Sequence, residues 1–96
     1  MPAYMIVNVT LTDAAAYENY KARVPTIIAR HGGEYLVRGG PHEVLEGTWQ
    51  PSRLVLFRFP DRAAIHAFMN DPDYAPLKAV RQSAAITDAV AVDGIA

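Results

Sequence analysis

Arg53-Leu54-Val55-Leu56-Phe57-Arg58-Phe59 is the stretch that decides the fold of this 96-residue chain. Its apolar side chains fall on both alternating faces of an extended strand, positions 55, 57 and 59 on one face and positions 54 and 56 on the other. Prolines bound the stretch on both sides, and a short apolar run between turn signals is typical of a strand buried on both faces. We therefore predict a strand over residues 53–59 that needs a cover on each face.

Further strands are predicted on both sides of this stretch. Residues 3–11 and residues 86–92 are rich in β-branched and apolar side chains, which favour an extended chain. Residues 33–38 are predicted as a strand that ends at the turn signal Gly39-Gly40-Pro41. A short return strand is expected over residues 42–46.

A long helix is predicted between the first two strands. Side chains from Tyr17 and Tyr20 to His31 recur at steps of three and four, which places them on one side of a helix. Thr12 or Asp13 precedes this pattern and supplies an oxygen that accepts from the first free backbone N–H groups.

Prolines and a glycine set limits on the helices. Pro25 lacks the N–H that would bond the carbonyl four residues earlier, so a bend or break is expected near residues 22–24. Gly32 is placed to end this helix. A second helix is expected from Asp61 to Asn70, followed by a restart with Pro72 at the first helical position.

The elements follow the order strand, helix, strand, strand, helix, strand. This is the split βαβ pattern of ferredoxin-like domains, which are α+β proteins with an antiparallel sheet and both helices on one face. The helices leave the second sheet face bare, and an apolar face of that size is more than monomers normally expose. We therefore predict a homodimer in which two copies pack these open sheet faces together.

Composition indicates an ordinary globular protein with a single domain over residues 1–96. Hydrophobic residues make up 51% of the chain and charged residues 20%. Nine basic and ten acidic residues give a net charge of −1 without a basic stripe, so nucleic acid is not an expected partner. The chain has no cysteine for a disulfide or thiol nucleophile. No apolar run is long enough to span a bilayer, and we expect a cytoplasmic protein with no membrane partner.

Polar side chains crowd the segment from Arg30 to Trp49, which makes it the expected place for a ligand. Arg38 ends a strand beside a glycine turn, where its guanidinium is suited to hold a carboxylate with two parallel hydrogen bonds. Gly39 and Gly40 would let a ligand approach the backbone closely. The alternative is that Arg38 pairs with an acidic side chain of its own chain or of a partner.

His31 is the candidate proton carrier, and with Arg38 it forms the predicted catalytic pair. Imidazole titrates near neutral pH, and the negative end of a helix favours its charged form. The alternative is a structural histidine that bonds the last carbonyls of the helix. The histidines lack the spacing of a metal-ligand motif, so neither a metal nor another cofactor is predicted.

Trp49, Arg53 and Tyr17 are assigned to ligand binding. Trp49 is the only tryptophan, and it could stack on a flat ligand or cover the core or the dimer edge. Arg53 begins the central strand and brings a second guanidinium close to this region. For Tyr17, a place in the core or in the interface is the alternative.

Several short motifs spread over nearly the whole chain together resemble a known family. They are Tyr17-Glu18-Asn19-Tyr20, His31-Gly32-Gly33, Tyr35-Leu36-Val37-Arg38-Gly39-Gly40, Leu45-Glu46-Gly47-Thr48-Trp49, Phe57-Arg58-Phe59-Pro60, and Tyr74 with Leu77 and Arg81. In this order they resemble the family catalogued as domain of unknown function 1330, within the dimeric α+β barrel superfamily. The resemblance implies a ferredoxin-like protomer and a barrel formed by two packed sheets, and it implies no established reaction.

Two functions remain open from the sequence, and with them the question of whether the protein is an enzyme. In the first, the protein binds a small anionic or aromatic metabolite, and any reaction is cofactor-independent: proton transfer, isomerisation or oxygenation. In the second, it is a non-catalytic interaction or structural module whose polar residues hold a dimer together. The enzyme hypothesis requires His31 and Arg38 to face a common cavity, whereas the structural one requires protein partners for their polar atoms.

Overall fold

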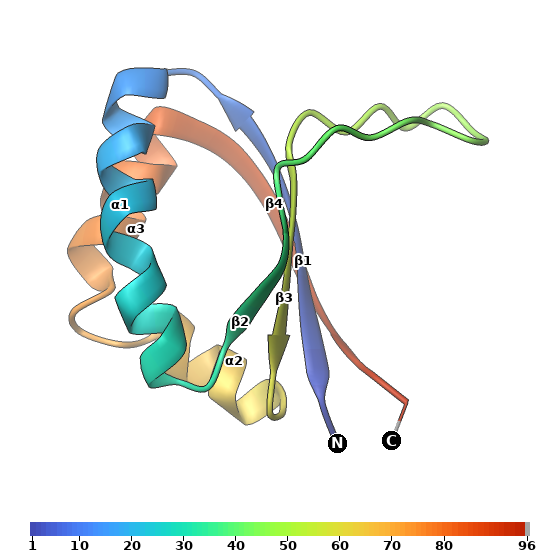
Figure 1. Ribbon diagram of the computed structural model, residues 1–96. Helices are drawn as coiled ribbons and strands as arrows, with labels where there is room; N and C mark the ends of the chain where they lie inside the picture. Colours follow the sequence, from blue (N-terminus) through green and yellow to red (C-terminus); the bar gives the residue numbers. More distant parts are fainter. Residues whose placement is uncertain (96) are drawn as a thin grey trace.

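A four-stranded antiparallel sheet with all of the described helices on one face makes up the structure, a computed structural model that describes residues 1–95 (Figure 1). The strands lie side by side in the order β2-β3-β1-β4, with β1 and β3 in the centre. This arrangement confirms the predicted ferredoxin-like α+β fold. The strands are β1 (Ala3–Leu11), β2 (Glu34–Arg38), β3 (Leu54–Phe59) and β4 (Ala85–Asp93).

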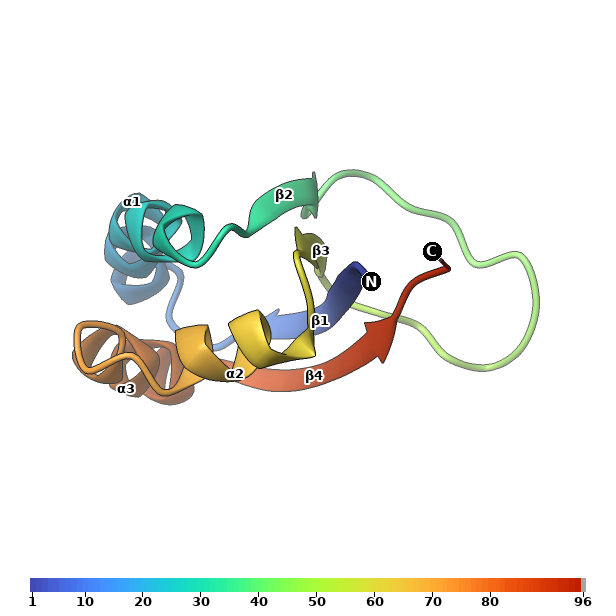
Figure 2. The same cartoon turned by 90° about the horizontal axis from the view of Figure 1, so that it is seen from below.

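The helical layer consists of α1 (Ala14–Arg30), α2 (Arg62–Met69) and α3 (Ala75–Ala84). Figure 2 shows α1 and α3 side by side on the same side of the sheet. Aspartates begin two of these helices, because Asp13 accepts a hydrogen bond from Ala16 N at 3.1 Å and Asp61 accepts one from Ala64 N at 2.8 Å. No helix within residues 1–95 is long and apolar enough to cross a membrane.

The register of β3 assigns its side chains to the two faces as the sequence predicts. Val55, Phe57 and Phe59 lie under the helices and are at most 6% exposed. The largest fully buried side chains of the core come from both layers: Tyr74, Phe59, Phe68, Ile28, Val9 and Val24.

The opposite face of the sheet, which we call the open face, carries apolar side chains that no described residue covers. Figure 1 shows that the loop between β2 and β3 also extends away from the sheet on this side. Large hydrophobic side chains of the open face and the loop are each at least 39% exposed: Leu36, Val37, Val44, Leu45, Trp49, Ile86, Val90 and Val92.

Two predictions about backbone breaks are wrong. Pro25 does not interrupt α1 near residues 22–24, because Val24 and Ile28 are buried in the core on either side of it and hold the helix in place. The third helix begins at Ala75 rather than at Pro72.

The predicted return strand over residues 42–46 is also wrong. These residues form no strand and are exposed, because the antiparallel partner of β2 is β3 itself and the polar side chains of His42, Glu43 and Glu46 favour solvent. The segment between the two strands is therefore a long loop.

Candidate functional site

Three residues on neighbouring strands, Arg53, Val9 and Thr87, form a row across one end of the helix-covered sheet face. We call it the polar row, because its two outer residues are polar. Val9 in β1 donates its N–H to Arg53 O at 2.9 Å and is paired with Thr87 in β4 on its other side. Val9 is buried under the helices, and Arg53 and Thr87 flank it at the wall of the same cavity. The row therefore places a guanidinium and a hydroxyl on the face that the helices cover.

A β-bulge brings Arg38 to this face. Tyr35 is paired with Phe57, but Val37 is paired with Leu56 and Arg38 with Val55, so the register shifts at Leu36. In a regular strand, residues 35 and 38 would point to opposite faces, whereas the extra residue turns Arg38 inward with Tyr35. The Arg38 guanidinium lies over the Tyr35 ring, 4.6 Å from its centroid.

Pro25 supplies the acceptor that holds Arg38. A proline has no N–H to donate, so the carbonyl of Lys21, four residues earlier in α1, loses its usual helical partner. Arg38 Nη2 donates to this Lys21 carbonyl at 2.8 Å. The proline thus leaves the helix intact and converts one of its carbonyls into an anchor for an arginine.

Arg53 lies against Gly39 at the mouth of the site. Gly39 has a φ of +71°, and a side chain at this position would overlap the Arg53 guanidinium. The guanidinium is 6.0 Å from the centroid of the Tyr17 ring. Arg53 Nε is shielded from solvent and has no hydrogen-bond partner among residues 1–95.

Tyrosines from α1 and from the segment before α3 form the opposite wall. The hydroxyls of Tyr20 and Tyr74 are hydrogen-bonded at 2.9 Å, and Arg81 Nε donates to the Tyr74 hydroxyl at 3.3 Å. Burial raises the pKa of Tyr20 far above its ordinary value, and the neighbouring Tyr74 adds to the rise. Burial also raises the pKa of Tyr17, against the opposing effect of Arg53. Tyr17 and Tyr20 therefore keep their protons at neutral pH.

Two adjoining spaces lie between these walls. The inner cavity, between the helices and the sheet, has a free volume of about 40 Å³, and many of its lining side chains are aromatic. The outer hollow, beside α1, is open to solvent and has a volume of about 350 Å³. Lys21, Arg38 and Arg53 line both spaces, so these three side chains separate the outer hollow from the inner cavity.

The arginines at these spaces lack acidic partners, whereas three of the four arginines elsewhere have one. Within residues 1–95, Arg38, Arg53 and Arg81 form no ion pair with a carboxylate. The one carboxylate at the outer hollow, Glu18, is paired with Lys21 at 3.3 Å. Away from the site, Arg23 is exposed to solvent without an ion pair among residues 1–95, and the others are paired: Arg30 with Asp73 at 2.8 Å, Arg58 with Glu34 at 3.6 Å and Arg62 with Asp93 at 2.8 Å.

The structure brings together four of the predicted site residues and separates the others. Arg38, Arg53 and Tyr17 line the inner cavity, and Gly39 packs against Arg53. His31, Gly40 and Trp49 do not line it, and Trp49 is 62% exposed in the loop.

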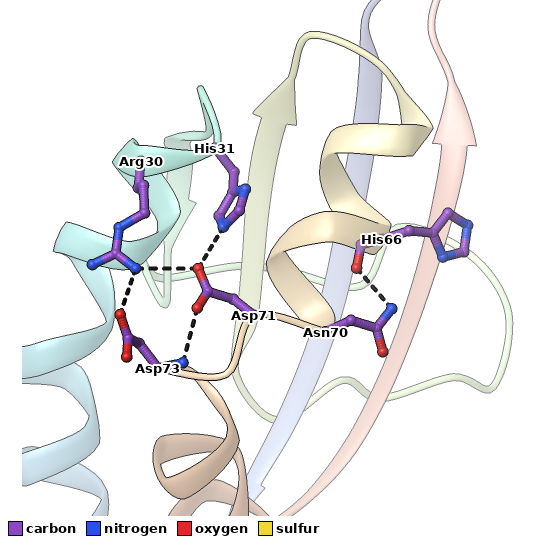
Figure 3. A network of polar contacts seen from close by, with 6 residues as sticks. All are labelled: Arg30, His31, His66, Asn70, Asp71 and Asp73. Atoms are coloured by element: carbon purple, nitrogen blue, oxygen red, sulfur yellow. Dashed lines mark hydrogen bonds and ion pairs between the residues drawn. The ribbon is translucent and has the colours of Figure 1, made fainter.

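His31 belongs to a separate polar network at the other end of α1 (Figure 3). Its Nε2 is 2.7 Å from Asp71 Oδ2, and Arg30 Nη1 is 3.2 Å from the same oxygen. Asp71 Oδ1 also accepts from Asp73 N at 2.8 Å, and the bond with His31 is the main reason that the pKa of Asp71 lies below its ordinary value. This network ties the end of α1 to the turn before α3, so His31 and Arg38 do not face a common cavity.

Sequence reasoning missed several residues of the site. Tyr20 was placed in the first helix and Thr87 in the last strand, and Tyr74 and Arg81 were named among the family motifs, all without a place in the site. The spacing of seven residues between Tyr74 and Arg81 puts them on one side of a helix, and this was an available signal. No comparable signal exists for Thr87, since its position becomes informative only beside Arg53. Among residues 1–95, no group of three or more potential ligands is arranged to hold a metal ion.

Comparison with solved structures places the chain among ferredoxin-like α+β proteins. It is similar to a protein of unknown function from Rhodopseudomonas palustris, with 22% identity, a TM-score of 0.81 and coverage of 99% of this chain and 83% of that one. SnoaB, a cofactor-independent oxygenase from Streptomyces nogalater, is 14% identical with a TM-score of 0.68, and 99% and 94% of the two chains are covered. A dimeric ferredoxin-like protein of unknown function from Jannaschia sp. is 13% identical with a TM-score of 0.66, and 98% and 100% are covered.

The family follows from the sequence itself. The model of the domain of unknown function DUF1330 matches residues 2–95, and the chain belongs to this family. This confirms the family to which its motifs pointed. No curated protein matches the chain significantly.

Proposed function

We propose that this protein binds a small aromatic anion, a carboxylate or a phenolate, where the outer hollow meets the inner cavity. The observation that carries the proposal is the set of three arginines without acidic partners, Arg38, Arg53 and Arg81, around an aromatic cavity. Guanidinium groups bind carboxylates with two parallel hydrogen bonds, and an anion would supply the missing countercharge.

The aromatic walls favour a planar ligand. Six aromatic side chains surround the inner cavity: Tyr17, Tyr20, Tyr35, Phe57, Phe68 and Tyr74. The free volume of about 40 Å³ accommodates little more than a water molecule, so a ring has to displace side chains. Met69 and Arg53 line the cavity, and both side chains are long and unbranched, so a change of their rotamers would enlarge it.

Any reaction at this site would use the protein's own side chains. We propose cofactor-independent proton transfer, isomerisation or oxygenation, with Arg38 as the clamp for the anion. The similarity of the fold to that of a cofactor-independent oxygenase supports chemistry of this kind on such a scaffold. His31 lies outside this cavity, so the predicted catalytic pair with Arg38 is not part of this proposal. Its role as a proton carrier stays a prediction, as do Trp49 and Gly40 as ligand contacts. A non-catalytic module is the alternative.

We further propose that two copies pair through the open face. A standard interface buries about 800 Å² on each partner, and the exposed hydrophobic side chains of the open face and the loop offer an area of that order. The dimeric ferredoxin-like neighbour supports such a pairing. The mass in solution tests it, since one chain has 10.5 kDa. The cytoplasmic location also stays a prediction, for cell fractionation to test.

A thermal-shift titration with benzoate and phenols tests the ligand site. A ligand at a hundred times its dissociation constant adds about 2.7 kcal/mol of stability. In a domain of this size, that raises the melting temperature by about ten degrees or more. We expect such a shift for the wild type and for Arg23→Gln, a matched variant at an exposed arginine of α1 outside the site.

In Arg38→Gln the shift should be largely lost while the unliganded protein stays folded. If no carboxylate or phenol shifts the wild type, and Arg38→Gln only melts earlier, then Arg38 is a structural residue. The non-catalytic module would then be the better interpretation.

A further inference from the structure

Thr87 has a hydroxyl for which residues 1–95 provide no partner. The residue lies on the helix-covered face of β4, where Ala85 and Ala89 are its neighbours on the same face. Thr87 Oγ1 is shielded from solvent and forms no hydrogen bond with any group in residues 1–95. Thr87 lines the inner cavity, so the side-chain displacement that admits a ring there would also give a ligand access to this hydroxyl.

The folded chain gains nothing from this hydroxyl. A buried polar group without a partner lowers stability, whereas valine has the same shape, suits a strand equally well and carries no polar atom. The hydroxyl therefore has a use only if a ligand or a water molecule bonds to it.

Thr87 stands across the cavity from the arginines. Neighbouring strands are about 4.8 Å apart, so Arg53 and Thr87, on either side of Val9, start about 10 Å from each other. Both side chains leave the sheet on its helix-covered face, so a ligand that contacts Arg53 and Thr87 would lie over Val9. The two shielded polar atoms without partners, Arg53 Nε and Thr87 Oγ1, thus lie at the two ends of one row.

We propose that Thr87 determines specificity by bonding a hydroxyl or carbonyl oxygen at the end of the ligand opposite its anionic group. The site then prefers a hydroxylated aromatic acid to the same acid without the hydroxyl. This inference rests on the proposed function, since it needs the anion to be held by Arg38 and Arg53.

Calorimetric titration with benzoate and with 4-hydroxybenzoate tests the inference. One neutral hydrogen bond corresponds to about a 3- to 10-fold difference in affinity, so the wild type should bind 4-hydroxybenzoate tighter by that factor. Thr87→Val should abolish this preference by weakening 4-hydroxybenzoate alone, with the affinity for benzoate unchanged. Thr87→Ser keeps the hydroxyl and should retain the preference, as should Thr26→Val, a control at an exposed threonine of α1.

Each of the other outcomes would overturn either the role of Thr87 or the proposed function. Equal affinity of the wild type for both acids overturns the role of Thr87 and leaves the proposed function standing. A loss of affinity for both acids in Thr87→Val means that Thr87 acts through packing, which also overturns the inference. Binding of neither acid to the wild type overturns the proposed function, and the role of Thr87 with it.

Discussion

The two faces of the same sheet have nearly the same apolar character and opposite surroundings. On the helix-covered face, Val55 and Phe57 are buried and belong to the core of the chain. On the open face, Val90 and Val92 are equally apolar, but about half of their surface is in contact with solvent. The difference shows that the helices of one chain of this length cover only one face of its sheet. One face stabilises the fold, and the other is left for association.

The covered face is itself divided along the strands. Its middle is filled by aromatic side chains such as Phe57 and Phe59, which pack with Tyr35 and Phe68. Its end at Val9 carries the polar row, where arginines without acidic partners surround the inner cavity. The packed core and the proposed ligand site therefore occupy neighbouring parts of one face.

Truncation of a core side chain should have the largest effect. Phe57→Ala removes a side chain that is 6% exposed, and we expect a loss of about 3–5 kcal/mol of unfolding free energy. Chemical denaturation measures this loss. Leu56→Ala, one residue away on the open face, is the matched comparison, and its loss should be clearly smaller in the monomer. Equal losses would mean that both faces are buried within one chain.

A charge on the open face should separate the copies without unfolding them. Val90 is 59% exposed, so Val90→Lys costs the folded monomer little, whereas two lysines would meet across a two-fold interface. We expect the dimer to weaken at least tenfold, about 1.4 kcal/mol, as measured by light scattering over a dilution series. Ala63→Lys, an exposed position on α2, is the control. A mass that stays the same in Val90→Lys would assign the interface to another surface.

Replacing Pro25 should affect the site more than the fold. Pro25→Ala restores an N–H that competes with Arg38 for the Lys21 carbonyl. We expect stability to rise by about 1–2 kcal/mol, because proline is unfavourable inside a helix. Affinity for an aromatic carboxylate should fall as Arg38 loses its anchor. Denaturation and titration on the same variant separate the two effects, and unchanged affinity would show that the bulge alone positions Arg38.

Part of the grouping of residues at the proposed site was accessible from the sequence. Arg38, Arg53 and Tyr17 were predicted to lie together and they line one cavity, because charged and aromatic side chains near a glycine turn are distinctive. Their role in binding stays a prediction. His31 and Trp49 share that composition and lie elsewhere. Proximity in the sequence placed them with Arg38, but α1 separates His31 from Lys21 by several turns, and Trp49 is 62% exposed in the loop between β2 and β3.

The sequence by itself determined the order of the strands and helices, the start of one helix at Asp61 and of another at Thr12 or Asp13, and the two apolar faces of β3. These follow from periodicity and from hydrogen bonds between residues a few positions apart, which a local stretch of chain already contains. Only the tertiary structure decided that the bulge at Leu36 turns Arg38 inward and that Thr87 stands in one row with Arg53. It also decided that His31 bonds Asp71, 40 residues further along. Such pairings depend on how separate strands and helices come into register, and no local pattern fixes that register.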